Sequence, residues 1–168
     1  WGLSTRMIGA IVMAHGDDKG LRLPPKVAPF QVVLVPIFKN DDERAPVMEA
    51  VSRLSKELLD ANIRIHIDKR EGLSPGFKYN DWEMRGVPVR MEIGPKDVQN
   101  NSVALARRDV PGKEGKQFVP QAGIAATVQE LLTAIQANML RQATEFRDAN
   151  IKDVGSYEEL KGLMESGG

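Results

Sequence analysis

The sequence predicts an α/β protein with a mixed five-stranded sheet flanked by three helices, preceded by a short segment that belongs to another unit. Two observations support this prediction. Short apolar runs rich in Val and Ile alternate with longer segments whose apolar residues recur at helical spacing. The elements come in the order β-α-β-α-β-β-β-α, which is typical of an α/β domain with helices packed on a sheet.

The first half of the predicted domain contains two strands and the helix between them. Residues 30–37 form a nearly continuous apolar run with three valines, as expected of a strand buried on both faces. Residues 40–43, Asn-Asp-Asp-Glu, are helix-starting residues. The helix that follows has apolar residues at helical spacing, namely Val47, Val51, Leu54 and Leu58. Residues 63–67 alternate between isoleucine and polar residues, which predicts a half-buried strand.

The second half begins with a helix over residues 74–85, where Ser-Pro supplies a cap and a first helical residue. Alternating apolar residues over 87–93 predict the third strand. Residues 102–108 and 116–121 form two further strands, joined by a turn around Pro111-Gly112. A long helix ends the domain. Its apolar stripe consists of Val128, Leu131, Leu132, Ile135, Met139 and Phe146.

The chain divides into three parts. Residues 1–28, with an extended start at Trp1–Ser4 and a helix reaching His15, do not form a domain and end in a connector that contains Pro24-Pro25. Residues 29–149 form the α/β domain. Residues 150–168 are a linker with one short helix over 157–164 and a Ser-Gly-Gly end. Because the first residue is Trp rather than Met, we expect a piece of a longer protein.

Composition excludes several classes of protein. The chain has no cysteine, which excludes disulfides, thiol catalysis and cysteine-ligated metals. Its longest apolar run, residues 7–14, is too short to cross a hydrocarbon core of about 30 Å, so no membrane partner is expected. With 23 basic and 23 acidic side chains, the formal net charge is zero, which argues at first sight against a nucleic-acid partner.

The zero net charge is the sum of segments whose net charges have opposite signs. Residues 123–168 carry four basic and seven acidic side chains, whereas residues 85–116 carry seven basic and four acidic ones. The basic stretch is compatible with a nucleic-acid interface and equally with an ordinary solvated surface.

No motif in the chain composes a complete active site. Residues 112–116 lack the earlier glycine and the final Ser/Thr of a phosphate-binding loop, and no dinucleotide fingerprint is present. His15, Asp17 and Asp18 could bind a metal, but a polar turn after a helix explains them better. His66 lies in a predicted strand and is expected to be structural.

Two blocks resemble the prolyl-tRNA synthetase family of class II, in the form shared by archaea, eukaryotes and some bacteria. Residues 1–6, Trp-Gly-Leu-Ser-Thr-Arg, with residues 15–25, are similar to motif 3 and the exit from the catalytic domain. Residues 75–97, beginning Pro-Gly-Phe-Lys-Tyr-Asn-Asp-Trp-Glu, are similar to the anticodon-binding domain. The resemblance covers essentially the whole chain and implies the class II anticodon-binding fold behind a remnant of the catalytic domain.

The first block implies a part of an ATP site. Its arginine, Arg6, matches the family position that binds the triphosphate, and a guanidinium suits this because its planar fork grips phosphate oxygens with two donors. Ser4 matches a position near the nucleotide. The intact enzyme would use ATP with Mg²⁺, whereas the other class II motifs are missing here, so the chain alone is expected to need no cofactor and to activate no proline.

The second block implies an anticodon site. The matching positions are Tyr79, Glu83, Arg90, Lys96 and Asp97, with Lys113 in the following hairpin. Proline codons begin CC, so proline tRNAs carry two adjacent guanines in the anticodon. Unpaired bases are read by aromatic stacking and by contacts to their edges. Carboxylates can accept from guanine N1–H and N2–H₂, and cations can donate to O6 and N7.

Alternatives to this interpretation remain open at this stage. Tyr79 could belong to the core, and Glu83 could simply pair with Arg85 or Arg90. Phe77 and Trp82 are expected to serve packing. The competing function is a protein-interaction or accessory module with the same fold, and a small-ligand α/β protein is disfavoured by the absent phosphate loops.

The resemblance further implies proline tRNA as the partner, with proline and ATP as substrates of a cytoplasmic, homodimeric parent enzyme. Many members of the family continue into a C-terminal domain whose cysteines can hold zinc. No cysteine occurs in this chain, so no metal site is predicted.

Overall fold

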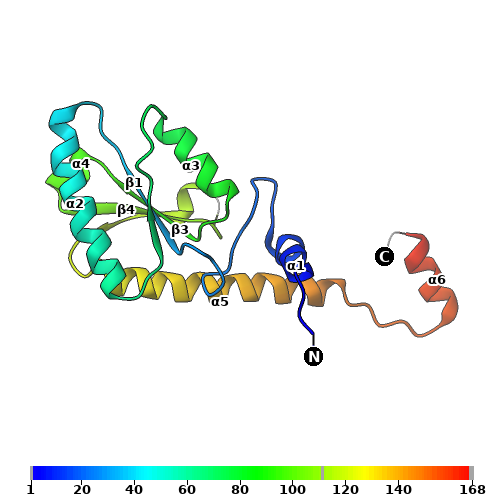
Figure 1. Cartoon of the computed structure of the whole chain (residues 1–168). Helices are drawn as coiled ribbons and strands as arrows, with labels where there is room; N and C mark the ends of the chain where they lie inside the picture. Colours follow the sequence, from blue (N-terminus) through cyan, green and yellow to red (C-terminus); the bar gives the residue numbers. More distant parts are fainter. Residues whose placement is uncertain (1, 111, 167–168) are drawn as a thin grey trace.

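The computed structural model describes residues 2–110 and 112–166. The fold predicted from the sequence is confirmed: one five-stranded mixed sheet carries helices on both faces (Figure 1). Trp1 of the predicted extended start, Pro111 of the predicted turn and the final glycines at 167–168 lie outside the described residues.

The strands lie in the spatial order β2-β1-β3-β4-β5. Their bounds are β1 Val32–Pro36, β2 Ile65–Ile67, β3 Val89–Ile93, β4 Ser102–Arg107 and β5 Lys116–Pro120. Strand β1 pairs in parallel with β2 and β3, because a helix returns the chain each time, whereas β3, β4 and β5 pair antiparallel through short connections. The β1 run is buried at every residue, as its continuous apolar sequence predicts.

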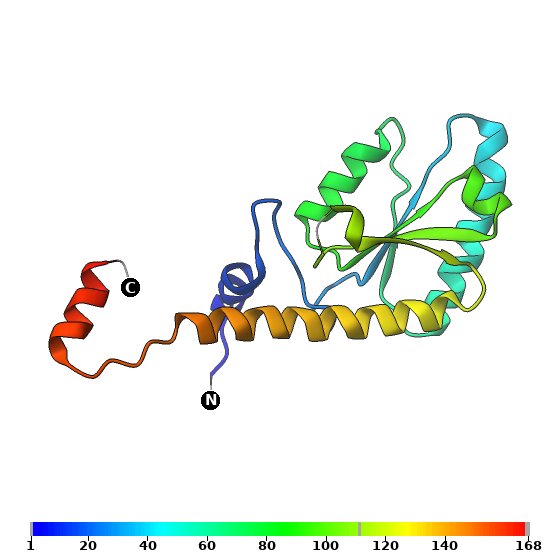
Figure 2. The same ribbon diagram turned by 180° about the vertical axis from the view of Figure 1, so that it is seen from behind.

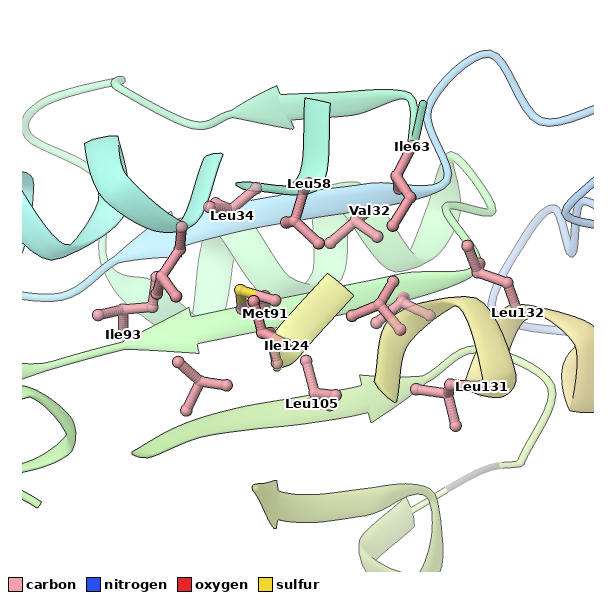
Figure 3. Close-up of a cluster of buried hydrophobic side chains, with 14 of the residues drawn as sticks. Val32, Leu34, Leu58, Ile63, Met91, Ile93, Leu105, Ile124, Leu131 and Leu132 are labelled. Atoms are coloured by element: carbon pink, nitrogen blue, oxygen red, sulfur yellow. The ribbon is translucent and has the colours of Figure 1, made fainter. Parts of the chain in front are cut away.

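The main core lies between the sheet and two helices, α2 (Asp41–Asp60) and α5 (Ile124–Asn150). Figure 3 shows its centre, where Leu34 and Met91 from neighbouring strands lie with Leu58 of α2 and Ile124 of α5. The side chain of Asn40 caps α2 by accepting from the Glu43 amide at 2.9 Å. Apolar periodicity and capping therefore place α2 as the sequence predicts.

A smaller core lies on the opposite face, beneath helix α3 (Pro75–Met84). Strand residues alternate between faces, so Val33 and Val35 point away from the main core and pack with Trp82 and Val87. Helix α3 is therefore seen on the other side of the sheet from α5 (Figure 2). The predicted packing role of Trp82 is confirmed. That of Phe77 is wrong, because its position on α3 turns it outward and leaves it 54% exposed.

One element differs from the sequence prediction. Gly94-Pro95 opens a short helix, α4 (Pro95–Gln99), rather than a simple turn, because proline suits the first helical position and the Asp97 side chain accepts from the Gly94 amide at 2.8 Å. A single 3₁₀ turn, η1 (Gly112–Gly115), lies between β4 and β5.

The N-terminal segment consists of helix α1 (Arg6–His15) and a connector, residues 16–31. The connector runs beside the end of α3, where the Leu21 amide donates to the Met84 carbonyl at 2.9 Å and the Leu23 amide donates to the Gly86 carbonyl at 3.1 Å. The close approach of the connector requires glycine at position 86. A Cβ there would lie 2.7 Å from Leu21, and the φ of Gly86 is +75°, which favours glycine.

Helix α5 continues well past the sheet, beside α1 (Figure 1). The predicted apolar stripe is buried from Val128 to Met139, but Phe146 is 74% exposed, because no strand or helix of the domain lies beneath that part of α5. The predicted short helix near the end is present as α6 (Tyr157–Glu165).

Candidate nucleic-acid interface

A buried carboxylate holds α3 on the sheet. Asp68, just after β2 and 1% exposed, accepts from Trp82 Nε1 at 2.8 Å and from Arg70 Nη2 at 2.7 Å. Lys78 Nζ lies 3.9 Å from the same carboxylate. Burial by itself would raise the pKa of Asp68, but the hydrogen bonds from Arg70 and Trp82 outweigh it and hold the pKa well below its usual range. Asp68 is therefore a charged anchor for the helix.

Tyr79 and Arg90 form the centre of the site. The Arg90 guanidinium lies 4.2 Å from the centroid of the Tyr79 ring, within cation–π range. Arg90 Nε donates to Glu92 Oε1 at 3.0 Å, and Lys116 Nζ donates to Glu92 Oε2 at 2.7 Å. Tyr79 is half-buried, and burial together with the Glu92 carboxylate raises the pKa of its hydroxyl. The phenol therefore stays neutral, and its ring lies between Arg90 and the smaller core.

Glu83 lies one turn after Tyr79 on α3. Its carboxylate pairs with Lys19 of the connector at 3.3 Å. The sequence left open a pairing with Arg85 or Arg90, but Arg85 pairs with Asp81 at 3.2 Å and Arg90 with Glu92. Because the pair with Lys19 is partly exposed, a ligand that donates hydrogen bonds can compete for the Glu83 carboxylate.

Glu83 and Arg90 line one cavity of about 160 Å³ between α3 and the sheet. Ala106 of β4 contributes to its wall and Lys19 to its rim. Arg108 also lines it, although it is largely buried and its Nε donates to the Glu83 carbonyl at 2.9 Å. The cavity thus combines one carboxylate with several cations.

Lys96 and Asp97 lie on α4, directly after β3. Lys96 is exposed. One oxygen of Asp97 caps Gly94, so a ligand could reach the carboxylate only at its other oxygen. Asp97 also helps to raise the pKa of Tyr79, which places its charge near the aromatic ring.

Lys113 lies on the 3₁₀ turn and is exposed. The neighbouring Gly112 lines the cavity that holds Glu83 and Arg90, so Lys113 lies at its border. All six residues of the predicted anticodon site therefore come from the α3 face or from the ends of strands that border it.

Ser4 and Arg6 are separate from this group. Both are exposed at the start of α1, which packs beside α5. The Ser4 hydroxyl accepts from the Arg6 amide at 3.4 Å. Ser4 and Arg6 do not line the cavity that holds Glu83 and Arg90. Figure 1 shows α1 well apart from α4, whereas Val12 of α1 shares a pocket with Met84 at the end of α3.

Several residues of the interface were not predicted from the sequence. Glu92 is 4% exposed and links two cations, although the alternation of β3 suggests a solvated residue. Lys19 and Arg108 reach Glu83 from distant segments. Only Glu92 carried a local signal, since a carboxylate in a central strand requires cationic partners.

The connector is tied to the domain by Asp17. Its carboxylate accepts from Arg108 Nη1 at 2.7 Å, and this hydrogen bond is the main reason that the pKa of Asp17 falls to about 2. The Asp17 carboxylate, considered above as a metal ligand, is therefore paired with Arg108. Across residues 2–110 and 112–166, no group of three or more His, Asp or Glu side chains is arranged to hold a metal. The same residues include no helix long and apolar enough to span a bilayer.

Comparisons with known proteins find relatives that match nearly the whole chain. The family model described as "Anticodon binding domain" matches residues 31–138. A proline–tRNA ligase of Chloroflexus aggregans is 54% identical over 167 residues, covering 99% of this chain and 35% of that protein. The chloroplastic/mitochondrial proline–tRNA ligase of Arabidopsis thaliana is 51% identical and covers 99% of this chain and 31% of its own length.

A solved structure shows the same similarity in three dimensions. Prolyl-tRNA synthetase of Cryptosporidium parvum, crystallised with L-proline and AMP, superposes with a TM-score of 0.88 at 37% identity. The match covers 94% of this chain and 33% of that one. The chain therefore spans about a third of the length of the curated relatives it matches.

Proposed function

The chain belongs to the anticodon-binding domain family, and from this premise we propose that it is the part of a proline–tRNA ligase that binds the anticodon of proline tRNA. The domain proper would be residues 29–149, which contain the matched range, with residues 1–28 a remnant of the catalytic domain and 150–168 a linker. One observation carries the proposal. Acceptors and donors suited to guanine edges gather around a half-buried tyrosine on one face of the sheet.

The chemistry of guanine fits these groups. Its N1–H and N2–H₂ are adjacent donors on the pairing edge, and Glu83 offers a carboxylate at the cavity wall that can accept from both. O6 and N7 are acceptors, for which Arg90 is the nearest fork of donors in the cavity. Stacking on Tyr79 or on the Arg90 plane would hold the base in place.

Binding requires Glu83 to change partners. The carboxylate pairs with Lys19 in the free chain, so guanine donors must displace that ammonium. An adenine in the same place presents an acceptor at N1 toward the carboxylate, which leaves Glu83 without a donor. This difference supplies discrimination, because a partly buried charge is costly to leave unpaired.

Lys96, Asp97 and Lys113 would act at the second guanine and at the backbone. Asp97 offers its free oxygen near Tyr79. The exposed Lys96 and Lys113 can reach O6, N7 or a phosphate. Because phosphate contacts are indifferent to sequence, the lysines should contribute affinity more than selectivity.

The whole enzyme would activate proline with ATP and transfer it to the tRNA. Arg6 fits a place at the triphosphate, since its side chain stands exposed at the start of α1. ATP, with Mg²⁺, would be a substrate of the complete active site, to which Ser4 and Arg6 contribute a part. A homodimeric, cytoplasmic parent completes the proposal.

The test is a titration of the 168-residue chain with a fluorescent anticodon stem-loop of proline tRNA. A matched stem-loop in which both guanines are replaced by adenines is the control. We expect weak binding that favours the guanine stem-loop, because the chain has no net positive charge to attract phosphates, and the phosphate contacts that its lysines make should weaken as salt rises. Equal affinity for both RNAs would refute specific reading and would favour an accessory module with this fold.

A further inference from the structure

A line of five side chains in contact crosses the sheet from α3 to the edge strand β5. Arg90 stacks on Tyr79 at 4.2 Å and pairs with Glu92 at 3.0 Å. Lys116 pairs with the other oxygen of Glu92 at 2.7 Å, and its ammonium lies 5.6 Å from the centroid of the Phe118 ring. The line begins and ends on an aromatic ring, with alternating charges between them.

Phe118 has no packing role that explains it. It is 69% exposed on an edge strand, whereas its neighbour Val119 packs against the main core. An exposed aromatic on an unpaired edge invites association with other chains, so it is a liability unless something covers it. The register pairs Phe118 with Ala104, whose side chain is too small to support the ring.

The side chains between the two rings lie on one face of the sheet. Arg90, Glu92, Lys116 and Phe118 point to the same side as Ala104 and Ala106 of β4, their register partners, of which Ala104 is only 2% exposed. Helix α3 covers this face over β1 through Trp82 and reaches β3 through the contact of Tyr79 with Arg90. Two strand spacings, about 10 Å, separate β3 from β5, so the strand that carries Phe118 lies near the strand that carries Arg90.

We propose that Phe118 is a second stacking platform, which takes an unpaired base adjoining the two guanines in the anticodon loop. This inference rests on the proposed function. The occupant is RNA because the line of contacting side chains runs from Phe118 directly to Arg90 and Tyr79 of the candidate interface, and because Lys116 and Arg90 outnumber Glu92 along it, which suits a strand that carries phosphates.

The platform should accept any base. Lys116, the polar neighbour that contacts Phe118, is paired with Glu92, so the exposed Phe118 ring presents an aromatic face without a dedicated hydrogen-bonding group. Stacking is tolerant of sequence because every base has a π-face. Proline anticodons vary outside the two guanines, and a stacking residue holds such a variable base without selecting it.

The experiment compares Phe118→Ala with Phe146→Ala, since Phe146 is equally exposed, at 74%, but lies on α5. Titration with the proline anticodon stem-loop should show a 5- to 150-fold loss of affinity, as expected for ~1–3 kcal/mol of stacking, for Phe118→Ala alone. The preference for guanine over adenine at the two guanine positions should not change. Phe118→Tyr should restore binding.

A second series locates the base. Stem-loops with an abasic site on either side of the guanine pair should reveal one position at which Phe118→Ala no longer weakens binding. Phe118→Trp should lose fluorescence when RNA binds, while Phe146→Trp should not. The platform is refuted if Phe118→Ala binds as the unmodified chain does under conditions where Arg90→Ala is weakened.

Two other outcomes separate this inference from its premise. If the unmodified chain does not distinguish guanine from adenine, the proposed function fails and the platform fails with it. If Phe118→Ala instead changes the sedimentation of the free chain and leaves RNA binding intact, the ring belongs to a contact between copies of the chain, and only the platform is overturned.

Discussion

Replacing Asp68 with alanine should loosen helix α3 from the sheet at a cost that the structure allows us to work out. The carboxylate is 1% exposed and accepts from Arg70 and Trp82, with the Lys78 ammonium 3.9 Å away. Arg70 would keep a partner, because its Nη1 also pairs with Asp81 at 2.8 Å. The loss therefore falls on two groups, the Trp82 indole N–H and the buried Lys78 ammonium.

The magnitude follows from leaving the indole N–H without a partner and the Lys78 ammonium with only the Asp68 backbone carbonyl, 3.5 Å from its Nζ. Removing one side of a buried charged network costs about 3–5 kcal/mol, of which an unsatisfied indole N–H accounts for about 1–3 kcal/mol. Asp68→Asn keeps an oxygen for Trp82 but removes the charge, so it should cost less, about 1–3 kcal/mol. Glu71→Gln is the matched control, because the Glu71–Arg44 pair is exposed and should contribute under about 1 kcal/mol.

Urea unfolding followed by circular dichroism measures these free energies, and the fluorescence of Trp82 reports on the α3 face itself. Helix α3 carries Tyr79 and Glu83, so Asp68→Ala should also weaken binding of the proline stem-loop. A loss below 1 kcal/mol, similar to that of the Glu71 control, would refute the view that Asp68 anchors the helix.

Three further predictions concern the connector and α1. Gly86→Ala should lower the melting temperature far more than Gly112→Ala. Both glycines have a φ of +75°, but only a Cβ at position 86 would lie 2.7 Å from the connector backbone. Equal shifts in melting temperature would contradict this. Because Arg108 lowers the pKa of Asp17 from 3.8 to about 2, that contact should stabilise the chain above about pH 4 and be lost as the pH falls toward 2. Asp17→Asn should flatten this part of an acid titration followed by amide exchange of the connector. Arg6→Ala should leave stem-loop affinity unchanged while abolishing proline-dependent pyrophosphate exchange in the full-length ligase, and normal exchange would rule out its role at ATP.

The strands and long helices were predictable because their signals are local. Strand β1 is signalled by its continuous run of valines. Helix α2 is signalled by one cap, Asn40, and by one apolar period, Val47, Val51, Leu54 and Leu58. Phe146 continues the same helical period as Met139, and sequence alone does not tell where the sheet beneath α5 ends. Helix α4 was missed because Gly-Pro signals a turn and a first helical turn alike.

The interface was predictable only in part, for a physical reason. Tyr79, Glu83 and Arg90 were found through a resemblance that fixes residue types along the chain. Their partners come from elsewhere: Lys19 lies on the connector, and Lys116 reaches Glu92 across β4. Such contacts depend on strand order and register, which no local pattern specifies.

The central claim is that Glu83 reads the pairing edge of a guanine, and a double-mutant cycle tests it directly. Inosine lacks only the N2 amino group of guanine, so each anticodon guanine is replaced by inosine in turn, and affinity is measured for the unmodified chain and for Glu83→Ala. We expect that, at one of the two positions, inosine weakens binding by the unmodified chain and has no effect on Glu83→Ala, with a coupling energy of about 1 kcal/mol or more. Additive effects at both positions would contradict it.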